Sequence, residues 1–158
     1  MALSFNIETL ASTERKLVVK FSLVNDSGTS ELAKTDLIDP ADYTSQEGKA
    51  CSYVSIDRIW ATVETGIQVL LHWDASTDYY VWGANGVGSS SVMTASSDFT
   101  LGGWGGLVPP GKGANSVTTN TGTGAGTGAT DGTLLISTLG ISANDVLTVV
   151  VEGTKHYA

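Results

Sequence analysis

Apolar and polar residues alternate along most of the strongly apolar segments of this 158-residue sequence. Residues 16–24 show the pattern well, because every second residue is large and apolar while those between are mostly polar. Successive side chains of a strand point to opposite faces, so a period of two is typical of a strand with one buried face. We expect this strand to enter the core through Leu17, Val19, Phe21 and Leu23.

Similar patterns predict further strands. They lie at residues 2–9, 35–38, 53–64, 67–74, 79–83, 133–139 and 146–152. In the first of these, Leu3, Phe5 and Ile7 share the apolar face. Residues 53–64 carry apolar side chains on both faces, which indicates a central strand or a face covered by a partner. Asp39 followed by Pro40 predicts a helical turn within residues 41–48.

The connection between residues 53–64 and 67–74 is Thr65-Gly66. A two-residue connection that contains glycine is typical of a tight hairpin. We therefore expect these two segments to be an adjacent antiparallel pair in one sheet. The second segment presents Trp73 on the same face as other apolar residues, which predicts that this tryptophan lies in the core.

The order of the predicted strands favours a single all-β domain. The chain has the size of one domain, and its last two predicted strands follow a long glycine-rich stretch. Such an excursion indicates pairing between segments far apart in the sequence. We expect one β-sandwich over residues 1–158, of the jelly-roll or Greek-key type, with long Gly/Thr-rich loops. A flexible loop or arm is expected at about residues 114–133, where threonine and glycine dominate.

The formal net charge is −8, from 16 acidic and 8 basic residues. A surface of this charge repels the phosphates of nucleic acids and the headgroups of anionic membranes, so neither is an expected partner. No apolar run has the length of a membrane span. The first residues lack the basic start and the long apolar run of a secretory signal, which predicts synthesis and retention in a cytoplasm.

Residues that could carry chemistry are few and widely separated. Cys51 is the single cysteine, and we expect a semi-buried apolar side chain rather than a reactive thiol. His72 and His156 stand far apart. His72 and Asp74 could form an acid–base or metal-binding pair, but no nucleophile or third ligand has a fitting spacing, which favours a role in cross-strand packing or hydrogen bonding. We predict no catalytic residue, no metal and no cofactor, and therefore no enzyme; a hydrolase built on His72 and Asp74 is one alternative.

Two glycine-rich stretches share only their spacing with nucleotide-binding loops. Residues 106–113 have the spacing of a phosphate-binding loop, but Gly113 stands where a serine or threonine must hold Mg²⁺. Pro109 and Pro110 also lack the amide hydrogens that such a loop uses. Residues 124–129 fit a loose dinucleotide pattern inside a Thr/Gly repeat, without the strand and helix that it requires. Neither stretch predicts nucleotide binding.

The four tryptophans divide into two pairs. Trp60 and Trp73 fall in predicted strands and are expected in the core or an interface, whereas Trp82 and Trp104 adjoin glycine-rich loops and are candidates for the surface. Exposed apolar groups on loops are unfavourable unless a partner covers them, and prolines lower the entropy lost on ordering. We expect residues 83–133 to supply much of a protein interface. The candidate interface residues are Trp82, Trp104, Leu107, Val108, Pro109 and Pro110.

Three segments resemble small structural proteins from the virions of tailed bacteriophages. They are residues 59–78 (IWATVETGIQVLLHWDASTD), 98–107 (DFTLGGWGGL) and 147–152 (LTVVVE). The similarity is to the decoration or cement type of virion protein and covers roughly the last two-thirds of the chain. None of the three segments is a catalytic signature, so the resemblance implies no functional residue for this chain.

The resemblance implies a β-sandwich or jelly-roll on the outside of a capsid. Its partner would be the major capsid protein, whose subunit contacts it reinforces, and the chain would form a homo-oligomer such as a trimer. It would be made in the host cytoplasm and located on the virion surface. The alternative is a carbohydrate-binding or host-adhesion module of a virion, in which Trp82 or Trp104 stacks on sugars.

Overall fold

The computed structural model describes residues 3–86, 92–101, 105–112 and 130–157. These residues form nine strands and one short 3-10 helix. The strands are β1 (Leu3–Ser12), β2 (Lys16–Asn25), β3 (Thr35–Ile38), β4 (Cys51–Glu64), β5 (Gln68–Trp73), β6 (Tyr79–Asn85), β7 (Val92–Asp98), β8 (Leu134–Leu139) and β9 (Val146–Tyr157). The helix η1 (Pro40–Asp42) is capped by Asp39, whose carboxylate accepts a hydrogen bond from the Ala41 amide at 2.8 Å. This confirms the predicted turn.

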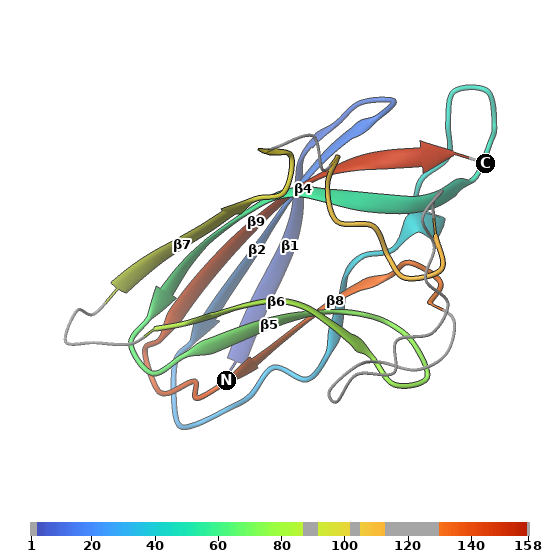
Figure 1. The fold of residues 1–158 in the computed structure, drawn as a ribbon. Coiled ribbons are helices and arrows are strands. Elements are labelled where there is room, and N and C mark those ends of the chain that lie inside the picture. The colour runs from blue at the N-terminus through green and yellow to red at the C-terminus, as the bar shows by residue number, and fades with distance from the viewer. Residues whose placement is uncertain (1–2, 87–91, 102–104, 113–129, 158) are drawn as a thin grey trace.

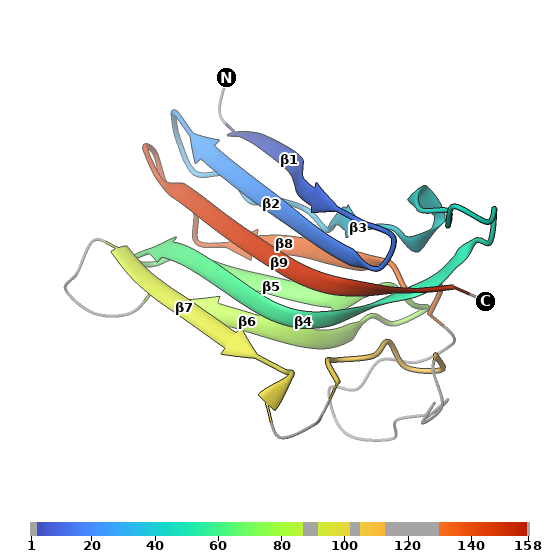
Figure 2. The same ribbon diagram turned by 90° about the horizontal axis from the view of Figure 1, so that it is seen from above.

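The strands form two antiparallel sheets that pack face to face (Figure 1, Figure 2). The larger sheet has the order β1-β2-β9-β4-β7, and the smaller sheet has the order β3-β8-β5-β6. Without β1, these are the two four-stranded sheets of a jelly-roll, in which the chain crosses repeatedly from one sheet to the other. β1 is a fifth strand beyond β2, at the edge of the larger sheet. The predicted all-β sandwich is confirmed.

The core lies between the two sheets and is filled by alternate residues of each strand. The predicted inward face of β2 is confirmed, because its four apolar side chains, from Leu17 to Leu23, are at most 1% exposed. Trp73 is 4% exposed, as its apolar neighbours predict. Other fully buried side chains are Ile38, Ile56, Ile59, Ile67, Leu71, Leu134, Ile136, Ile141 and Leu147. Burial of this apolar surface supplies the main force that holds the sheets together.

A β-bulge in β4 explains why its sequence is apolar on both faces. The register between β4 and β9 shifts between Ile56 and Arg58, so Asp57 is an extra residue without a partner in the ladder. The bulge lets Ile56 and Ile59 both point into the core, where each is fully buried. Trp60 then faces outward and is 39% exposed. β4 has a neighbouring strand on each side, β9 and β7, which agrees with the first of the two interpretations of its sequence, a central strand.

The predicted hairpin between β4 and β5 is wrong. β4 pairs with β9 and β7 in the larger sheet, and β5 pairs with β6 and β8 in the smaller sheet. Thr65-Gly66 therefore carries the chain across the sandwich. Gly66 has a φ of +92°, and its amide donates a hydrogen bond to the Gly86 carbonyl at 2.8 Å, which ties the turn to the end of β6 rather than closing a ladder. A short turn with glycine fits both a hairpin and a crossing, so the local sequence does not separate them.

Two edge strands differ from their predictions. β1 forms where it is predicted, but its apolar face lacks a cover: Phe5 is 47% exposed and Ile7 is 37% exposed. β7 has no counterpart among the predicted strands. Its residues that pair with the inward-facing residues of β4 include Ala95 and Ser97, which are too small to give an apolar alternation.

The end of the predicted flexible arm is packed against the domain. Thr130 and Thr133 are buried, and the Gly132 amide donates a hydrogen bond to Thr130 Oγ1 at 3.0 Å. The Asp74 amide donates to the Thr133 carbonyl at 2.9 Å. The earlier part of that arm, residues 114–129, lies outside the described residues.

Candidate protein interface

Four of the six predicted interface residues lie in the loop that follows β7. We call residues 99–101 and 105–112 the β7 loop. Within it, Val108 is 41% exposed, Leu107 and Pro110 are half-buried, and Pro109 is buried. Trp104 lies outside the described residues, so its predicted role is not addressed by the structure. The loop thus combines a buried anchor with an exposed apolar side chain.

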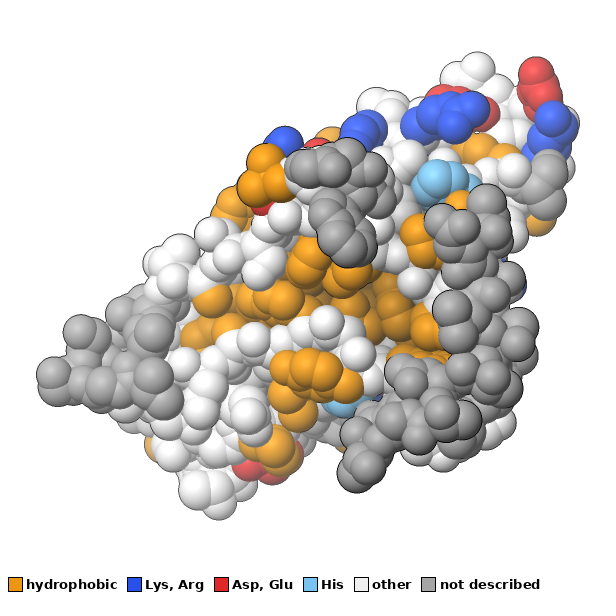
Figure 3. All heavy atoms as spheres, in the orientation of Figure 1, with side chains coloured by type: hydrophobic (Ala, Val, Ile, Leu, Met, Phe, Trp, Pro, Cys, Tyr) orange, Lys and Arg blue, Asp and Glu red, His pale blue; other side chains and the backbone are white. Residues whose placement is uncertain are grey.

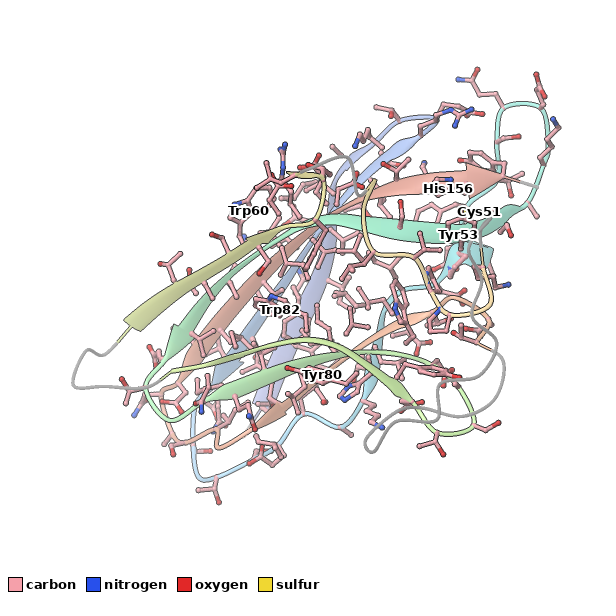
Figure 4. All side chains as sticks on the ribbon, in the orientation of Figure 1. Cys51, Tyr53, Trp60, Tyr80, Trp82 and His156 are labelled. Carbon is pink, nitrogen blue, oxygen red and sulfur yellow. The ribbon has the colours of Figure 1, made fainter. Side chains whose placement is uncertain are left out.

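The predicted surface position of the sixth residue, Trp82, is wrong. Its side chain is 9% exposed and lies between the two sheets rather than on the surface (Figure 4). The indole Nε1 donates a hydrogen bond to Ser97 Oγ at 2.9 Å, which joins β6 of one sheet to β7 of the other. Small side chains on the inner face of β7, such as Ala95 and Ser97, leave room for a ring of this size. Trp82 is therefore part of the packing between the sheets.

Backbone hydrogen bonds anchor the β7 loop to the bulge of β4. The amides of Ile56 and Leu107 each donate to the carbonyl of the other at 2.8 Å. The Phe99 amide donates to the Asp57 carbonyl, also at 2.8 Å. The Gly106 amide donates to the Phe99 carbonyl at 3.2 Å and closes the loop on itself. These bonds continue the pairing on this side of β4 beyond the end of β7 at Asp98.

Gly106 is needed for this close approach. A Cβ atom at this position would lie 2.8 Å from Asp57 Oδ1 and 2.9 Å from the Ile56 carbonyl oxygen. Gly106 also has a φ of +92°, in the left-handed region that residues with a side chain rarely adopt. Any larger residue would therefore push the loop away from β4.

A buried carboxylate fixes the bulge from the other side. Asp57 is 3% exposed, and its carboxylate accepts hydrogen bonds from Lys16 Nζ at 2.6 Å and Thr154 Oγ1 at 2.7 Å. Lys16 Nζ also lies 3.8 Å from Glu152 Oε1. A buried charge is costly unless it is paired and hydrogen-bonded, so these partners account for the position of Asp57. The predicted apolar pattern of β4 gives no sign of this ion pair.

A second ion pair holds the end of β7, where the loop begins. Arg58 Nε donates to Asp98 Oδ2 at 3.0 Å, and Arg58 Nη1 lies 3.6 Å from Glu152 Oε2. Hydrogen bonds from the hydroxyl and the amide of Thr100 lower the pKa of Asp98 below its ordinary value, and Arg58 adds to this effect. These groups are exposed, so each contributes little stability alone. Together they set the direction in which the chain leaves β7.

A hollow of about 410 Å³ lies at the base of the β7 loop. It is lined by Asp98, Phe99, Leu101, Gly106 and Leu107. Leu101 is 69% exposed, the most exposed of the large apolar side chains among the described residues. On the side of the molecule shown in Figure 3, apolar side chains also gather in a band between β6 and β7. An apolar hollow beside an exposed leucine fits an apolar side chain of a partner protein.

The structure brings Ser55 and His156 together, which the sequence did not indicate. Ser55 Oγ lies 2.9 Å from His156 Nε2, and the Tyr53 ring stacks on the imidazole with ring centres 4.3 Å apart (Figure 4). Ser55 is fully buried, so a substrate cannot reach its hydroxyl in this arrangement. Burial, followed by the charge of Arg15, lowers the pKa of His156. The geometry favours a packing role for Ser55 and His156. Cys51, which lies nearby, is buried as predicted, and this burial raises the pKa of its thiol.

The predicted packing role of His72 is supported. Its ring meets the Tyr80 ring edge-on, with ring centres 5.8 Å apart. Burial is the main reason that the pKa of His72 lies below its ordinary value. Lys34, which also lowers this pKa, forms an ion pair with Asp78. The carboxylate of Asp78 is thus paired with Lys34.

Neither a metal site nor a membrane-spanning helix is found in the described part of the chain. No three histidine, cysteine, aspartate or glutamate side chains within it form a group that could hold a metal ion. In the same residues, no helix is long and apolar enough to cross a membrane.

Several carboxylates lie near one another around Asp74. The pKa of Asp74 is raised by burial and then by Asp131, Asp78 and Asp36. Asp74 therefore lies near three other carboxylates, one of which, Asp78, is paired with Lys34.

Two exposed features differ from what the sequence predicts. Leu101 lies between Thr100 and Gly102, without a pattern that marks it as exposed, and it is not one of the six candidate interface residues. Phe5 and Ile7 were expected inside because their alternation predicts a buried face. Alternation identifies the apolar face of a strand, but it does not tell whether a second sheet covers that face.

No family model matches this sequence, and no curated protein matches it. The fold and the surface are therefore the guides to function. Jelly-roll sandwiches occur in viral capsid proteins, lectins and cupins. Because one fold serves many functions, the fold alone does not select among these classes.

Proposed function

We propose that this chain is a non-enzymatic structural protein of a virion. It binds the outside of a tailed-phage capsid as a decoration or cement protein and stabilises contacts between subunits of the major capsid protein. It is made in the host cytoplasm and acts on the capsid surface as a homo-oligomer such as a trimer. Many copies on one shell add their modest individual affinities, so each interface can be small.

The observation that carries this proposal is the anchored β7 loop. Its position is set by backbone pairing to β4, while Leu101 and Val108 remain exposed beside the apolar hollow. A preformed apolar contact loses little entropy when it meets a partner. The net charge of −8 supports a protein partner over nucleic acid.

Two observations weigh against the sugar-binding alternative. Trp82 is inside the sandwich, and the exposed aromatic rings Trp60 and Tyr80 lie on β4 and β6, which belong to different sheets (Figure 4). These two rings do not form one stacking surface. Trp104 lies outside the described residues and is the remaining candidate for that role.

Co-sedimentation with shells that lack this protein tests the proposal. The double variant Leu101→Ser with Val108→Ser should bind shells at least about tenfold more weakly, because a buried leucine or valine contributes roughly 1.5–3 kcal/mol. Leu139→Ser is the matched control, since Leu139 is 50% exposed at the end of β8, far from the loop in the sheet order. Undiminished binding of the double variant, or an equal loss in the control, would place the interface elsewhere.

A further inference from the structure

The edge of the larger sheet opposite the β7 loop carries a second candidate surface. β1 pairs with β2 on one side, and the sheet ends at β1 in the described residues. The backbone groups of β1 that do not point toward β2 can therefore pair with another strand along this edge, in regular register from Leu3 to Thr9, with a register shift between Thr9 and Ala11. A long exposed edge is a template for pairing with another chain unless charge, proline or a cover blocks it.

The face of β1 that points toward the smaller sheet is apolar and open. Phe5 and Ile7 lie opposite Leu23 and Phe21 of β2, so they share the inward face, and the Phe5 ring stacks on the Phe21 ring with centres 5.8 Å apart. Yet the side chains of Phe5 and Ile7 are each more than a third exposed. The smaller sheet ends at β3, which contacts β2. A partner segment on this edge would bury apolar surface that the domain leaves in water.

Below this edge lies a hollow of about 250 Å³ with a strongly acidic wall. On one side it is lined by Ile7 and Thr9 of β1 and Val19 of β2. On the other side stand Asp36, Leu37, Asp39, Asp42 and Tyr43. Among the described residues, the hollow is therefore lined by three carboxylates and by no lysine or arginine. We call this hollow, together with the free edge of β1, the β1 groove.

The charges around the β1 groove favour a basic occupant. Asp36 and Asp42 are exposed, whereas Asp39 caps η1 with its carboxylate. Lys155 Nζ lies 5.2 Å from the centre of the Tyr43 ring, but this lysine is 4% exposed and bonds to Ser12 Oγ, so it does not line the groove. A cationic side chain in the groove would meet the exposed carboxylates of Asp36 and Asp42.

We infer that the β1 groove binds an extended, basic segment of a partner protein, which adds to β1 as a further strand. Apolar residues on the inward face of that segment would cover Phe5 and Ile7, and lysine or arginine side chains further along the same face would reach the carboxylates beside Ile7 and Thr9. Strands in a sheet lie about 4.8 Å apart, which is within the reach of these long side chains. This surface is on the edge opposite β7, and the inference does not depend on the proposed function.

A second copy of this chain fits the groove poorly. The only charged residue of β1 is Glu8, so pairing of two β1 strands would bring no cation to Asp36 and Asp42. Each copy would also add a net charge of −8. Like charges brought together oppose association. A basic segment from a different protein satisfies both the apolar face and the carboxylates.

The probe is a nine-residue peptide in which every second residue is threonine and the residues between are two valines followed by two lysines, so that valines and lysines share one face. It is titrated into the ¹⁵N-labelled full chain at low ionic strength. We expect amide shifts in β1 and η1 and a dissociation constant below about 1 mM, rising as salt is added. The double variant Asp36→Asn with Asp42→Asn should weaken binding at least about threefold, the range for losing partly exposed charge pairs. Phe5→Ser with Ile7→Ser should weaken it by about tenfold or more.

Glu8→Gln is the matched control, because it removes one carboxylate from the opposite face of the same strand, where Glu8 pairs with Lys20. Its binding should equal that of the unaltered chain. A peptide with glutamate in place of both lysines should bind at least about tenfold more weakly than the lysine peptide. The inference is overturned if shifts in β1 are absent at 1 mM peptide (about the limit set above), if Glu8→Gln weakens binding as much as the double variant, or if Phe5 and Ile7 instead hold two copies of the chain together in sedimentation.

Discussion

Ile56 and Leu107 exchange two backbone hydrogen bonds, each 2.8 Å long, although they stand far apart in the sequence. One residue belongs to the bulge of a central strand, and the other belongs to the loop after an edge strand. Because backbone hydrogen bonds fix position more tightly than exposed side chains do, the loop has a defined place on the sandwich. This connection turns a glycine-rich segment into a preformed surface.

Gly106→Ala should destabilise the protein by about 1–3 kcal/mol more than Gly111→Ala does. Both glycines have positive φ, +92° and +80°, so both variants strain the backbone. Only at Gly106 would the new methyl group clash with the Ile56 carbonyl and Asp57, since nothing lies within 4 Å of a Cβ at Gly111. Urea unfolding of the two variants measures the difference. Equal losses would show that the close approach to β4 carries no stability.

Trp73→Ala should lower the free energy of unfolding by about 3–5 kcal/mol, the range for truncating a buried aromatic side chain. Trp60→Ala is the matched comparison, because Trp60 is 39% exposed on the outer face of β4 while Trp73 is 4% exposed. We expect the Trp60 variant to lose less than about 1.5 kcal/mol. Denaturant melts of both proteins provide the test. A loss below about 1 kcal/mol for Trp73→Ala would contradict its place in the core.

Stability should fall as the pH drops below about 7. Burial lowers the pKa of both His72 and His156 below the ordinary value of about 6.5. Between the lowered histidine pKa of the folded chain and the ordinary pKa of the unfolded chain, the unfolded chain binds more protons than the folded chain. The stability that these histidines contribute is therefore greatest above the unfolded pKa and is lost as the pH falls through the folded pKa. Thermal melts at pH 7.5 and 5.5 (values on either side of about 6.5) should show this decrease. The double variant His72→Gln with His156→Gln should show a smaller decrease, and an unchanged decrease would assign the effect to other groups.

Strands with large alternating apolar side chains could be predicted from the sequence. Strands whose inward side chains are small could not. β2 was predicted correctly because its alternating apolar residues leave one possible inward face. β7 was missed because Ala95 and Ser97 are small, and they are small because Trp82 of the other sheet lies against that face. That reason exists only in the folded protein.

The candidate interface was predictable as a region but not in its details. Leu107 and Val108 were chosen because apolar residues on a glycine-rich loop require a partner, and Val108 is exposed as that reasoning expects. The anchoring of the loop could not be foreseen, since it depends on the bulge at Asp57. Thr65-Gly66 shows the same limit, because a two-residue turn gives no information about which sheet receives the next strand.

Imaging of capsid shells that lack this protein, before and after it is added, is the sharpest test of the proposed decoration role. We expect new density on the outer surface of the shell, into which the jelly-roll fits with the β7 loop facing the major capsid protein. Leu101 and Val108 should lie at that contact. An absence of new density, or density in which the β7 loop points away from the shell, would rule out this role.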